Sequence, residues 1–190
     1  EVGAMQPIAE CGALCKERGI TFHTDAVQPI GQLAIPVLPD MTTIAAHKFY
    51  GPKGIGALIV RDHVELCPQI LGGGQEFNLR AGSENLPAIV GMAKALEISL
   101  EKQPAEEKRL ITLRDDFIAQ LEALPGVTLN GPRTARLPNN ANIRFEGRSG
   151  ETIVIQLDLK GIAAATGSAC ASGSSGPSHV LEAMGRSDKA

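Results

Sequence analysis

The sequence HTDAVQ, residues 23–28, and the sequence AHKFYGPKG, residues 46–54, decide the fold. Each begins near the end of a short apolar segment that is typical of a buried strand, residues 20–24 and residues 42–46. The pattern also predicts a helix from Pro7 to Arg18 and a third strand over residues 56–60. Short buried strands alternating with helices indicate an α/β fold with a mostly parallel sheet, whose ligands bind beyond the carboxyl ends of the strands. Asp25 and Lys48 both fall at such ends.

The second half of the chain predicts a smaller domain. Helices are expected from Pro87 to about residue 100 and from about residue 106 to Gly126, separated by Gln103 and Pro104. A strand over residues 142–145, a helix over 151–160 and a strand over 162–164 follow. We therefore expect residues 1–103 to be the C-terminal part of a large α/β domain and residues 104–190 to be a small α+β domain. The second helix carries an apolar stripe that we expect to be core, formed by Leu110, Leu113, Phe117, Leu121 and Leu124.

The composition argues against several classes of protein. The chain has 190 residues, of which 43% are hydrophobic and 21% charged, so it can bury a sizeable core. A net charge of -3 without a basic cluster argues against nucleic-acid binding, and no apolar run reaches the roughly 18 residues of a membrane helix. The 4 cysteines do not resemble a secreted disulfide framework, and Cys11 and Cys15 have the spacing of a packed helix face rather than of a zinc site. These features predict a cytoplasmic protein without a metal site.

Lys48 and Asp25 point to one kind of cofactor. A lysine that follows an almost uncharged strand can become a Schiff-base nucleophile, and a carboxylate such as Asp25 can keep a pyridine nitrogen protonated. Gln28 could donate a hydrogen bond to the phenolic oxygen of the same ring. Together these residues indicate pyridoxal 5'-phosphate. The alternative is that Lys48 and Lys53 are ordinary loop lysines and that Asp25 caps a helix, because the spacing alone is weak evidence.

Cys170 lies in a stretch of small residues, TGSACASGSSG, which covers residues 166–176. No packing side chain stands near the sulfur, so we expect a mobile loop with an exposed and reactive thiol. Cys170 is therefore a candidate nucleophile. The alternative is an incidental cysteine in a flexible loop.

Four segments, taken in order, carry a more specific signal: HTDAVQPIGQL, AHKFYGPKGIGAL, GGGQEFNLRAGSENLPAIVGMAKALE and ATGSACASGSSGPSHVLEAMG. They resemble the cysteine desulfurases that supply sulfur for iron-sulfur cluster assembly, which belong to the class V aminotransferase group of pyridoxal phosphate enzymes. The long small-residue loop is similar to that of the NifS-like class. The resemblance implies the fold-type I transferase architecture and conversion of L-cysteine to L-alanine. Cys170 matches the loop cysteine that takes the sulfur as a persulfide and passes it to an iron-sulfur scaffold or another acceptor protein.

The resemblance also implies roles for the other candidate residues. Lys48 looks like the lysine that forms the Schiff base and moves protons, and Asp25 and Gln28 match ligands of the ring nitrogen and the phenolic oxygen. His47 matches a ligand of the cofactor phosphate. Ser83 stands where these enzymes usually carry a threonine that reaches the phosphate of the neighbouring subunit, which implies a homodimer.

Two features of the chain depart from the family pattern. Ala45 stands where family members commonly have a serine that contributes to the phosphate site. The family's chains are also considerably longer, so we expect this chain to be the middle-to-late piece of a desulfurase. Two other hypotheses stay open. One is another class V lyase or aminotransferase that uses Lys48 without a thiol, and the other is a non-catalytic fragment that acts as a dimerisation or sulfur-acceptor binding module.

Overall fold

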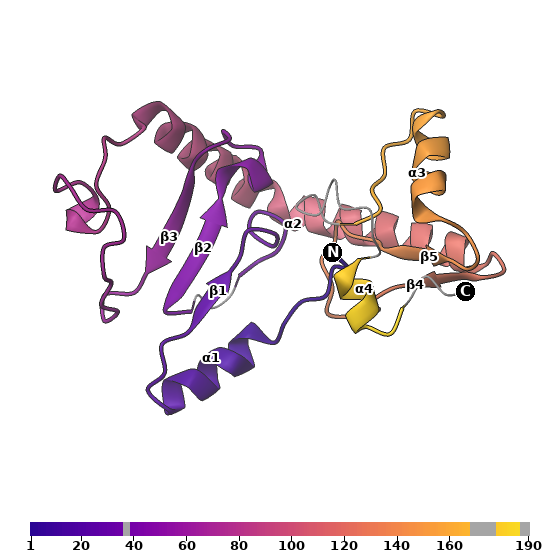
Figure 1. Ribbon diagram of the computed structural model, residues 1–190, viewed down its shortest axis with the longest axis horizontal. Coiled ribbons are helices and arrows are strands. Elements are labelled where there is room, and N and C mark those ends of the chain that lie inside the picture. Colours follow the sequence, from indigo (N-terminus) through magenta and orange to yellow (C-terminus); the bar gives the residue numbers. More distant parts are fainter. Residues whose placement is uncertain (36–38, 168–177, 187–190) are drawn as a thin grey trace. The chain divides into compact units, whose positions relative to one another are not determined.

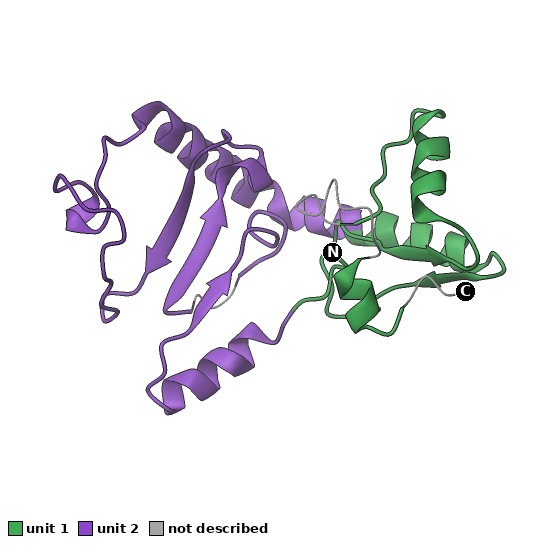
Figure 2. Ribbon diagram, viewed as in Figure 1, with its two compact units in different colours: residues 1–5, 111–190 green, residues 6–110 purple. Residues whose placement is uncertain are grey.

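A computed structural model describes residues 1–35, 39–167 and 178–186 of the chain (Figure 1). The helices are α1 (Ile8–Glu17), α2 (Leu86–Glu122), α3 (Gly150–Asp158) and α4 (His179–Ala183), with short 3-10 helices η1 (Ala46–Phe49) and η2 (Glu76–Asn78). The strands are β1 (His23–Asp25), β2 (Met41–Ala45), β3 (Gly56–Val60), β4 (Val127–Leu129) and β5 (Ile143–Phe145). The chain divides into two compact units: unit 1 holds residues 1–5 and 111–190, and unit 2 holds residues 6–110 (Figure 2). The domain boundary expected near Gln103 stays a prediction.

Unit 2 is built on a sheet with the strand order β1-β2-β3. β1 runs parallel to β2, with Asp25 opposite Thr43, whereas β3 runs antiparallel to β2, with Gly56 opposite Ala45. The predicted α/β class is confirmed, but the described part of the sheet is mixed rather than mostly parallel. The difference has a local cause, because the short connection from η1 into β3 cannot hold the crossover of a dozen or more residues that a parallel pair needs.

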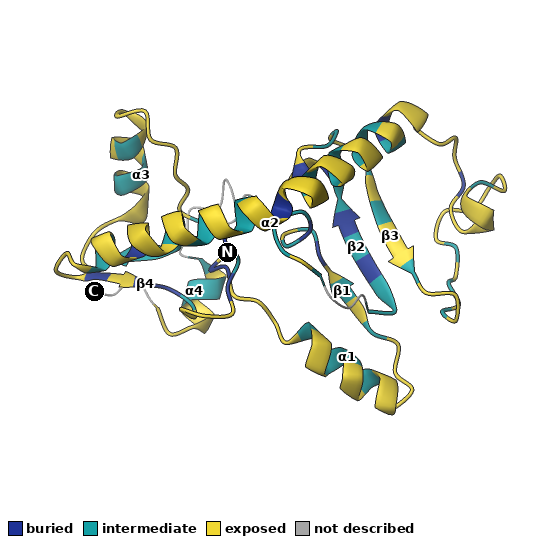
Figure 3. Cartoon of the chain, turned by 180° about the vertical axis from the view of Figure 1, so that it is seen from behind, coloured by how far each residue is buried: buried dark blue, intermediate teal, exposed yellow. Residues whose placement is uncertain are grey.

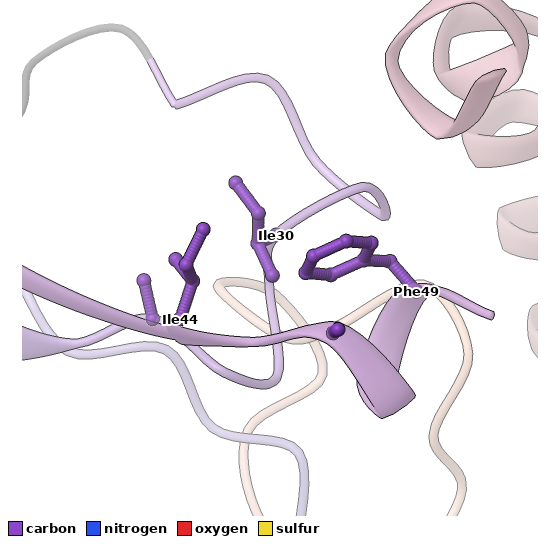
Figure 4. Close-up of a cluster of buried hydrophobic side chains, with 5 residues drawn as sticks. Ile30, Ile44 and Phe49 are labelled. Carbon is purple, nitrogen blue, oxygen red and sulfur yellow. The ribbon is translucent and has the colours of Figure 1, made fainter. Parts of the chain in front are cut away.

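The core of unit 2 lies between this sheet and α2. Ile44 comes from β2, Ile30 from the loop after β1, and Phe49 from the end of η1 (Figure 4). Burial along the strands is concentrated on β2, where Thr42 and Ile44 are buried and alternate with partly exposed residues (Figure 3). α2 covers this cluster with three partly buried side chains, those of Met92, Ala95 and Leu96. Burial of Ile30, Ile44 and Phe49, which are each at most 9% exposed, therefore fixes the loops that follow β1 and β2.

α1 is only partly buried. Cys11 and Cys15 are free thiols of intermediate burial, and Leu14 on the same helix is 52% exposed. A Cβ built at Gly12 would lie 3.6 Å from the ring of Phe22, so the helix contacts the chain just before β1. Among the described residues, no helix has the length and hydropathy needed to cross a membrane.

α2 is one continuous helix of 37 residues, and the predicted break at Gln103 and Pro104 is wrong. Proline inside a helix removes one backbone hydrogen bond and costs about 3 kcal/mol, which is why the sequence predicted two helices. The helix continues because it is held on both sides of Pro104, by Leu96 in the core of unit 2 and by the buried Ile118 in unit 1. Tertiary packing therefore overrides the local preference.

Unit 1 contains the antiparallel pair of β4 and β5, with Val127 opposite Phe145. The stripe predicted to be core is wrong for three of its members, because Leu113, Phe117 and Leu124 are 57%, 50% and 51% exposed. The buried position is Ile118, one residue further along α2, so the helix packs on a face rotated from the predicted one. Residues 162–164, predicted to be a strand, form none, and no described strand pairs with them.

Asp40 joins three segments of unit 2 at the start of β2. Its Oδ2 accepts a hydrogen bond of 2.8 Å from the backbone N–H of Phe22, and its Oδ1 lies 3.0 Å from Nε2 of His63. The hydrogen bond from Phe22, together with His63, lowers the pKa of the Asp40 carboxyl below its ordinary value. A carboxyl whose pKa is depressed by folding stabilises the folded state above its unfolded pKa, and this contribution is lost as the pH falls through the folded pKa.

Replacement Asp40→Asn is therefore expected to destabilise the protein at neutral pH but not at strongly acidic pH. The reason is that the variant lacks the charge that favours the hydrogen bond from Phe22, and the parent loses the same charge on protonation. Urea unfolding at a series of pH values between neutral and acidic measures the difference. Asp62→Asn is the control, because Asp62 is an exposed carboxylate that follows β3 and precedes His63 in the sequence. A difference between Asp40→Asn and the parent that stays constant with pH would contradict the prediction.

Candidate active site

The carboxyl ends of β1 and β2 lie side by side at one edge of the sheet in unit 2. The two strands are adjacent and parallel, and the N–H of Ala26 donates a hydrogen bond of 2.9 Å to the carbonyl of Thr43 just beyond the end of β1. Asp25 is the last residue of β1, and Lys48 follows β2 within η1. The structure thus places both residues at the edge where ligands bind in α/β sheets, as the strand pattern predicted.

The two loops that carry the candidate ligands share one apolar core. Ala26 and Ile30 enter it from the loop after β1, and Ala46 and Phe49 enter it from η1, and each is at most 9% exposed. Because side chains of both loops are buried in the same cluster, the backbone of each loop is fixed. The polar residues next to these buried positions are therefore held at the surface. These exposed polar residues are Asp25, Gln28, His47 and Lys48.

Asp25 is held by a turn of its own. Its Oδ1 accepts a hydrogen bond of 2.9 Å from the N–H of Val27, a side-chain-to-backbone bond that fixes the carboxylate as the chain leaves β1. Oδ2 has no hydrogen-bond partner among the described residues. No described helix begins between β1 and β2, so the alternative that Asp25 caps a helix is wrong. Oδ1 of Asp25 closes a turn with Val27, and Oδ2 is available to a ligand.

His23 is a residue of this edge that the sequence reasoning missed. Its Nε2 lies 2.8 Å from Oγ1 of Thr43, so the imidazole links β1 to β2 next to Asp25. Side chains two residues apart on a strand point to the same face of the sheet. This alternation would have allowed His23 to be predicted beside Asp25 from the sequence.

η1 sets the position of Lys48 through a closed turn. The N–H of Gly51 donates a hydrogen bond of 2.8 Å to the carbonyl of Ala46, and Tyr50 takes a left-handed conformation with φ of 65°. A Cβ built at Gly51 would lie 2.9 Å from Cβ of Ala46, closer than real Cβ contacts come, so the turn requires glycine here. Steric crowding against Ala46 therefore explains why glycine occupies position 51, three residues after Lys48.

Ser83 lies on a different loop of unit 2. The N–H of Gly82 donates a hydrogen bond of 3.2 Å to Oε1 of Gln75, and the N–H of Ala81 donates one of 3.0 Å to the carbonyl of Ile70. These bonds close the glycine-rich segment and leave the Ser83 hydroxyl exposed. No described contact joins Ser83 to the group at the strand ends, so its predicted role toward a neighbouring subunit stays a prediction.

Cys170 and most of the expected cysteine loop lie outside the described residues. The described chain stops at Gly167 and resumes at Ser178, which caps α4 by accepting a hydrogen bond of 3.3 Å from the N–H of Leu181. The prediction that Cys170 is a nucleophile therefore rests on the sequence.

Comparison with known proteins identifies the family. The family model described as aminotransferase class-V matches residues 1–187. The chain belongs to the class V aminotransferase family. Cysteine desulfurase IscS of Clostridium botulinum is 50% identical over 191 residues, which cover 97% of this chain and 48% of that protein. Cysteine desulfurase IscS of Dictyoglomus turgidum is 49% identical over 188 residues, which cover 97% of this chain and 48% of that protein.

The solved structures agree with this membership. The crystal structure of a NifS-like protein from Rickettsia africae matches with a TM-score of 0.87 and 32% identity, over 98% of this chain and 50% of that chain. The chain thus spans about half the length of the relatives that it matches. The predicted resemblance to cysteine desulfurases and the fold-type I class V architecture are confirmed, and the family is a pyridoxal phosphate-dependent one.

Proposed function

We propose that the protein is a pyridoxal phosphate-dependent cysteine desulfurase, which converts L-cysteine to L-alanine and a persulfide on Cys170 for iron-sulfur cluster assembly. The observation that supports this most directly is the position of Lys48. η1 places this lysine beyond the end of β2, at the sheet edge where the neighbouring parallel strand β1 ends in Asp25. An amine and a carboxylate brought to one edge by adjacent strands are the pair that the cofactor's aldehyde and pyridine nitrogen require.

The side chains at this edge fit the cofactor chemically. When bound, pyridoxal 5'-phosphate supplies an aldehyde that reacts with amines and a protonated ring that withdraws electrons from the substrate. Lys48 would hold the cofactor and move a proton at the substrate carbon, and the free oxygen of Asp25 would accept the hydrogen bond of the ring N–H. Gln28 would donate to the phenolic oxygen. His47 and Ser83 supply a ring nitrogen and a hydroxyl for a phosphate, the latter for the phosphate of a second subunit.

Cys170 would take the sulfur. Its thiolate attacks the sulfur of L-cysteine, so that an S–S bond forms as the C–S bond breaks and the electron pair of that bond stays with the carbon fragment. The carbon fragment takes up a proton and leaves as L-alanine. Cys170 is left as a persulfide, and the atoms and electrons of the two reactants balance without a further oxidant or reductant.

The same proposal covers partners and location. A homodimer is supported by the exposed position of Ser83, whose hydroxyl is accessible to the phosphate of a second subunit. The persulfide would pass its sulfur to an iron-sulfur scaffold or another acceptor protein. A cytoplasmic location is supported by the free thiols of Cys11, Cys15 and Cys67, which suit a reducing compartment.

Product analysis tests the proposed function. The purified protein is incubated with pyridoxal 5'-phosphate and L-cysteine, and the expected products are L-alanine and a Cys170 peptide whose mass has increased by one sulfur atom. Pyruvate in place of L-alanine would indicate a lyase, and amino transfer to an added keto acid would indicate an aminotransferase. Absence of cofactor binding would indicate the non-catalytic binding module. Each of these three results would overturn the proposal.

A further inference from the structure

Within unit 2, α2 contacts the turn that carries Lys48 at two places. The hydroxyl of Ser99 donates a hydrogen bond of 3.3 Å to the carbonyl of Phe49, the residue that follows Lys48. A Cβ built at Gly91 would lie 2.7 Å from Cγ of Pro52, at the other end of the turn. Gly91 and Ser99 are eight positions apart, a little more than two helical turns, so they lie on the same side of α2. This side of the helix therefore follows the turn from Phe49 to Pro52.

The contact with Ser99 supports the strained part of the turn. The carbonyl of Phe49 lies at the end of η1, where helix carbonyls lack a partner within the helix. It belongs to the peptide bond that leads into Tyr50, whose left-handed φ of 65° is unfavourable for a residue other than glycine. A hydrogen bond to this carbonyl fixes the orientation of that peptide bond. Ser99 thus stabilises a conformation that the turn does not favour by itself.

The loop after β1 meets α2 at the same point. A Cβ built at Gly31 would lie 3.0 Å from Cβ of Ser99 and 3.2 Å from Cβ of Phe49, so the backbone of this loop passes close to both residues. Gly31 follows Gln28 by three positions, and Phe49 follows Lys48 directly. The close packing of Gly31, Ser99 and Phe49 therefore fixes the spacing between the two loops that carry Gln28 and Lys48.

Gly91 permits a close approach of the turn to the helix. Its contact with Pro52 is closer than real Cβ contacts come, and the atoms that a Cβ would meet belong to a rigid ring, Cγ at 2.7 Å and Cδ at 3.3 Å. Glycine and serine are both weaker helix formers than alanine. α2 therefore carries less favourable helix residues at the two positions that contact the turn, and tertiary contact gives a physical reason for them.

We infer that Gly91 and Ser99 of α2 are positioning residues for Lys48, because they fix the turn that presents its amine at the end of β2. The inference deepens the proposed function and rests on it for the role of Lys48. The contacts between α2 and the turn stand independently of that role. In this account neither Gly91 nor Ser99 touches the cofactor, and both act through the backbone of the turn.

Hydrogen exchange of the Gly51 amide, measured without cofactor, tests the contacts. This amide closes the turn by donating to the carbonyl of Ala46, so its exchange reports opening of the turn. Gly91→Ala is expected to speed the exchange by roughly tenfold, because the added methyl group meets the Pro52 ring. Ser99→Ala is expected to speed it by about fivefold through the loss of one hydrogen bond. Unchanged exchange at Gly51 in either variant would overturn the inference.

Both substitutions introduce a better helix former, which sharpens the test. Slower or unchanged exchange of the α2 amides is expected, so faster exchange at Gly51 cannot come from a weaker helix. Exchange that rises equally throughout unit 2 would show general destabilisation and would overturn the positioning role.

A double-mutant cycle tests the steric part. Pro52→Ala removes the ring atoms Cγ and Cδ that a methyl group at position 91 would meet. The double variant Gly91→Ala with Pro52→Ala is therefore expected to match Pro52→Ala alone in the exchange of the Gly51 amide. Effects of the two substitutions that simply add would overturn the proposed contact.

Two other variants serve as matched controls. Gly12→Ala changes a glycine inside α1, where the new Cβ would lie at an ordinary 3.6 Å from the Phe22 ring. Lys94→Ala removes a side-chain hydrogen bond of 2.8 Å, to Glu97, from the exposed side of α2. Both are expected to leave the exchange of the Gly51 amide unchanged. A tenfold increase in either control would overturn the specific role of Gly91 and Ser99.

Titration with pyridoxal 5'-phosphate tests the link to Lys48. The cofactor concentration that gives half of the Schiff-base absorbance is expected to rise by about tenfold in Gly91→Ala, since small displacements of a reacting group are costly, and to return to the value of Pro52→Ala in the double variant. A normal band in the parent with no change in Gly91→Ala would overturn this inference alone. Absence of the band in the parent would overturn the proposed function and the role toward the cofactor together, whatever the exchange rates show.

Discussion

Replacement Lys48→Ala is expected to abolish the Schiff-base absorbance that appears when pyridoxal 5'-phosphate is added to the protein. The reason is chemical, because the aldehyde needs a primary amine at the edge where Asp25 ends β1, and Lys48 follows β2 at that edge. Turnover of L-cysteine is expected to fall by at least about 10³-fold, the scale seen when a covalent catalytic residue is removed. Visible absorbance spectra with and without L-cysteine measure the first effect, and L-alanine formation measures the second.

Lys53→Ala is the matched control for this experiment. Lys53 is an exposed lysine on the same loop, five positions after Lys48, and the sequence predicts no role for it in binding the cofactor. The control variant is expected to keep both the absorbance and the turnover. An absorbance band that survives in Lys48→Ala and disappears in Lys53→Ala would move the cofactor lysine to the other position.

Replacement Cys170→Ser is expected to separate cofactor chemistry from sulfur transfer. The serine hydroxyl is a poor nucleophile toward sulfur and cannot form a persulfide, so L-alanine formation is expected to fall by at least about 10³-fold. The Schiff-base absorbance and its shift on adding L-cysteine are expected to persist, because Lys48 is intact. Absorbance spectra and mass spectrometry of the Cys170 peptide, recorded on the same sample, measure the two properties.

Cys67→Ser serves as the control for a thiol without a proposed role. Cys67 is exposed and free, so its reactivity toward small reagents is expected to be easy to detect, yet its loss is expected to leave turnover unchanged. Full turnover in Cys170→Ser would rule out the desulfurase mechanism. It would favour a class V lyase or aminotransferase that uses Lys48 without a thiol.

The two expected results depend on different kinds of support. The role of Lys48 is supported by a sheet edge on which two parallel strands end together and by a core that fixes both loops. The role of Cys170 is supported by the composition of its segment and by the resemblance to cysteine desulfurases. Ala45, on β2 just before η1, has no hydroxyl for a phosphate, so His47 and the hydroxyl of Ser83 carry more of that proposed contact.

The approximate positions of the strands before Asp25 and Lys48, and the residues that could bind a cofactor, could be predicted from the sequence. The strand before Asp25 and the strand before Lys48 follow from short apolar segments bounded by proline and glycine, and β3 was predicted with the bounds that it has. The predicted ligands fall on exposed positions because their neighbours Ala26, Ala46 and Phe49 are buried. Family membership followed from motifs, which are local in the sequence. Strand positions, candidate ligands and family motifs depend on residue types and on spacings of a few residues, so they can be predicted directly from the sequence.

Other features were decided by tertiary structure alone. α2 continues through Pro104 because packing on both sides outweighs a local cost, and it buries Ile118 rather than Phe117 because the helix is rotated on its partners. The antiparallel direction of β3 and the hydrogen bond between His23 and Thr43 depend on how strands pair. The bond between Glu1 and Ser178 joins residues 177 positions apart. The sequence by itself determined the chemistry that the chain can offer and the strand ends that carry it. Which faces are buried and which distant residues meet was decided by the folded chain, because such contacts have no local signature in the sequence.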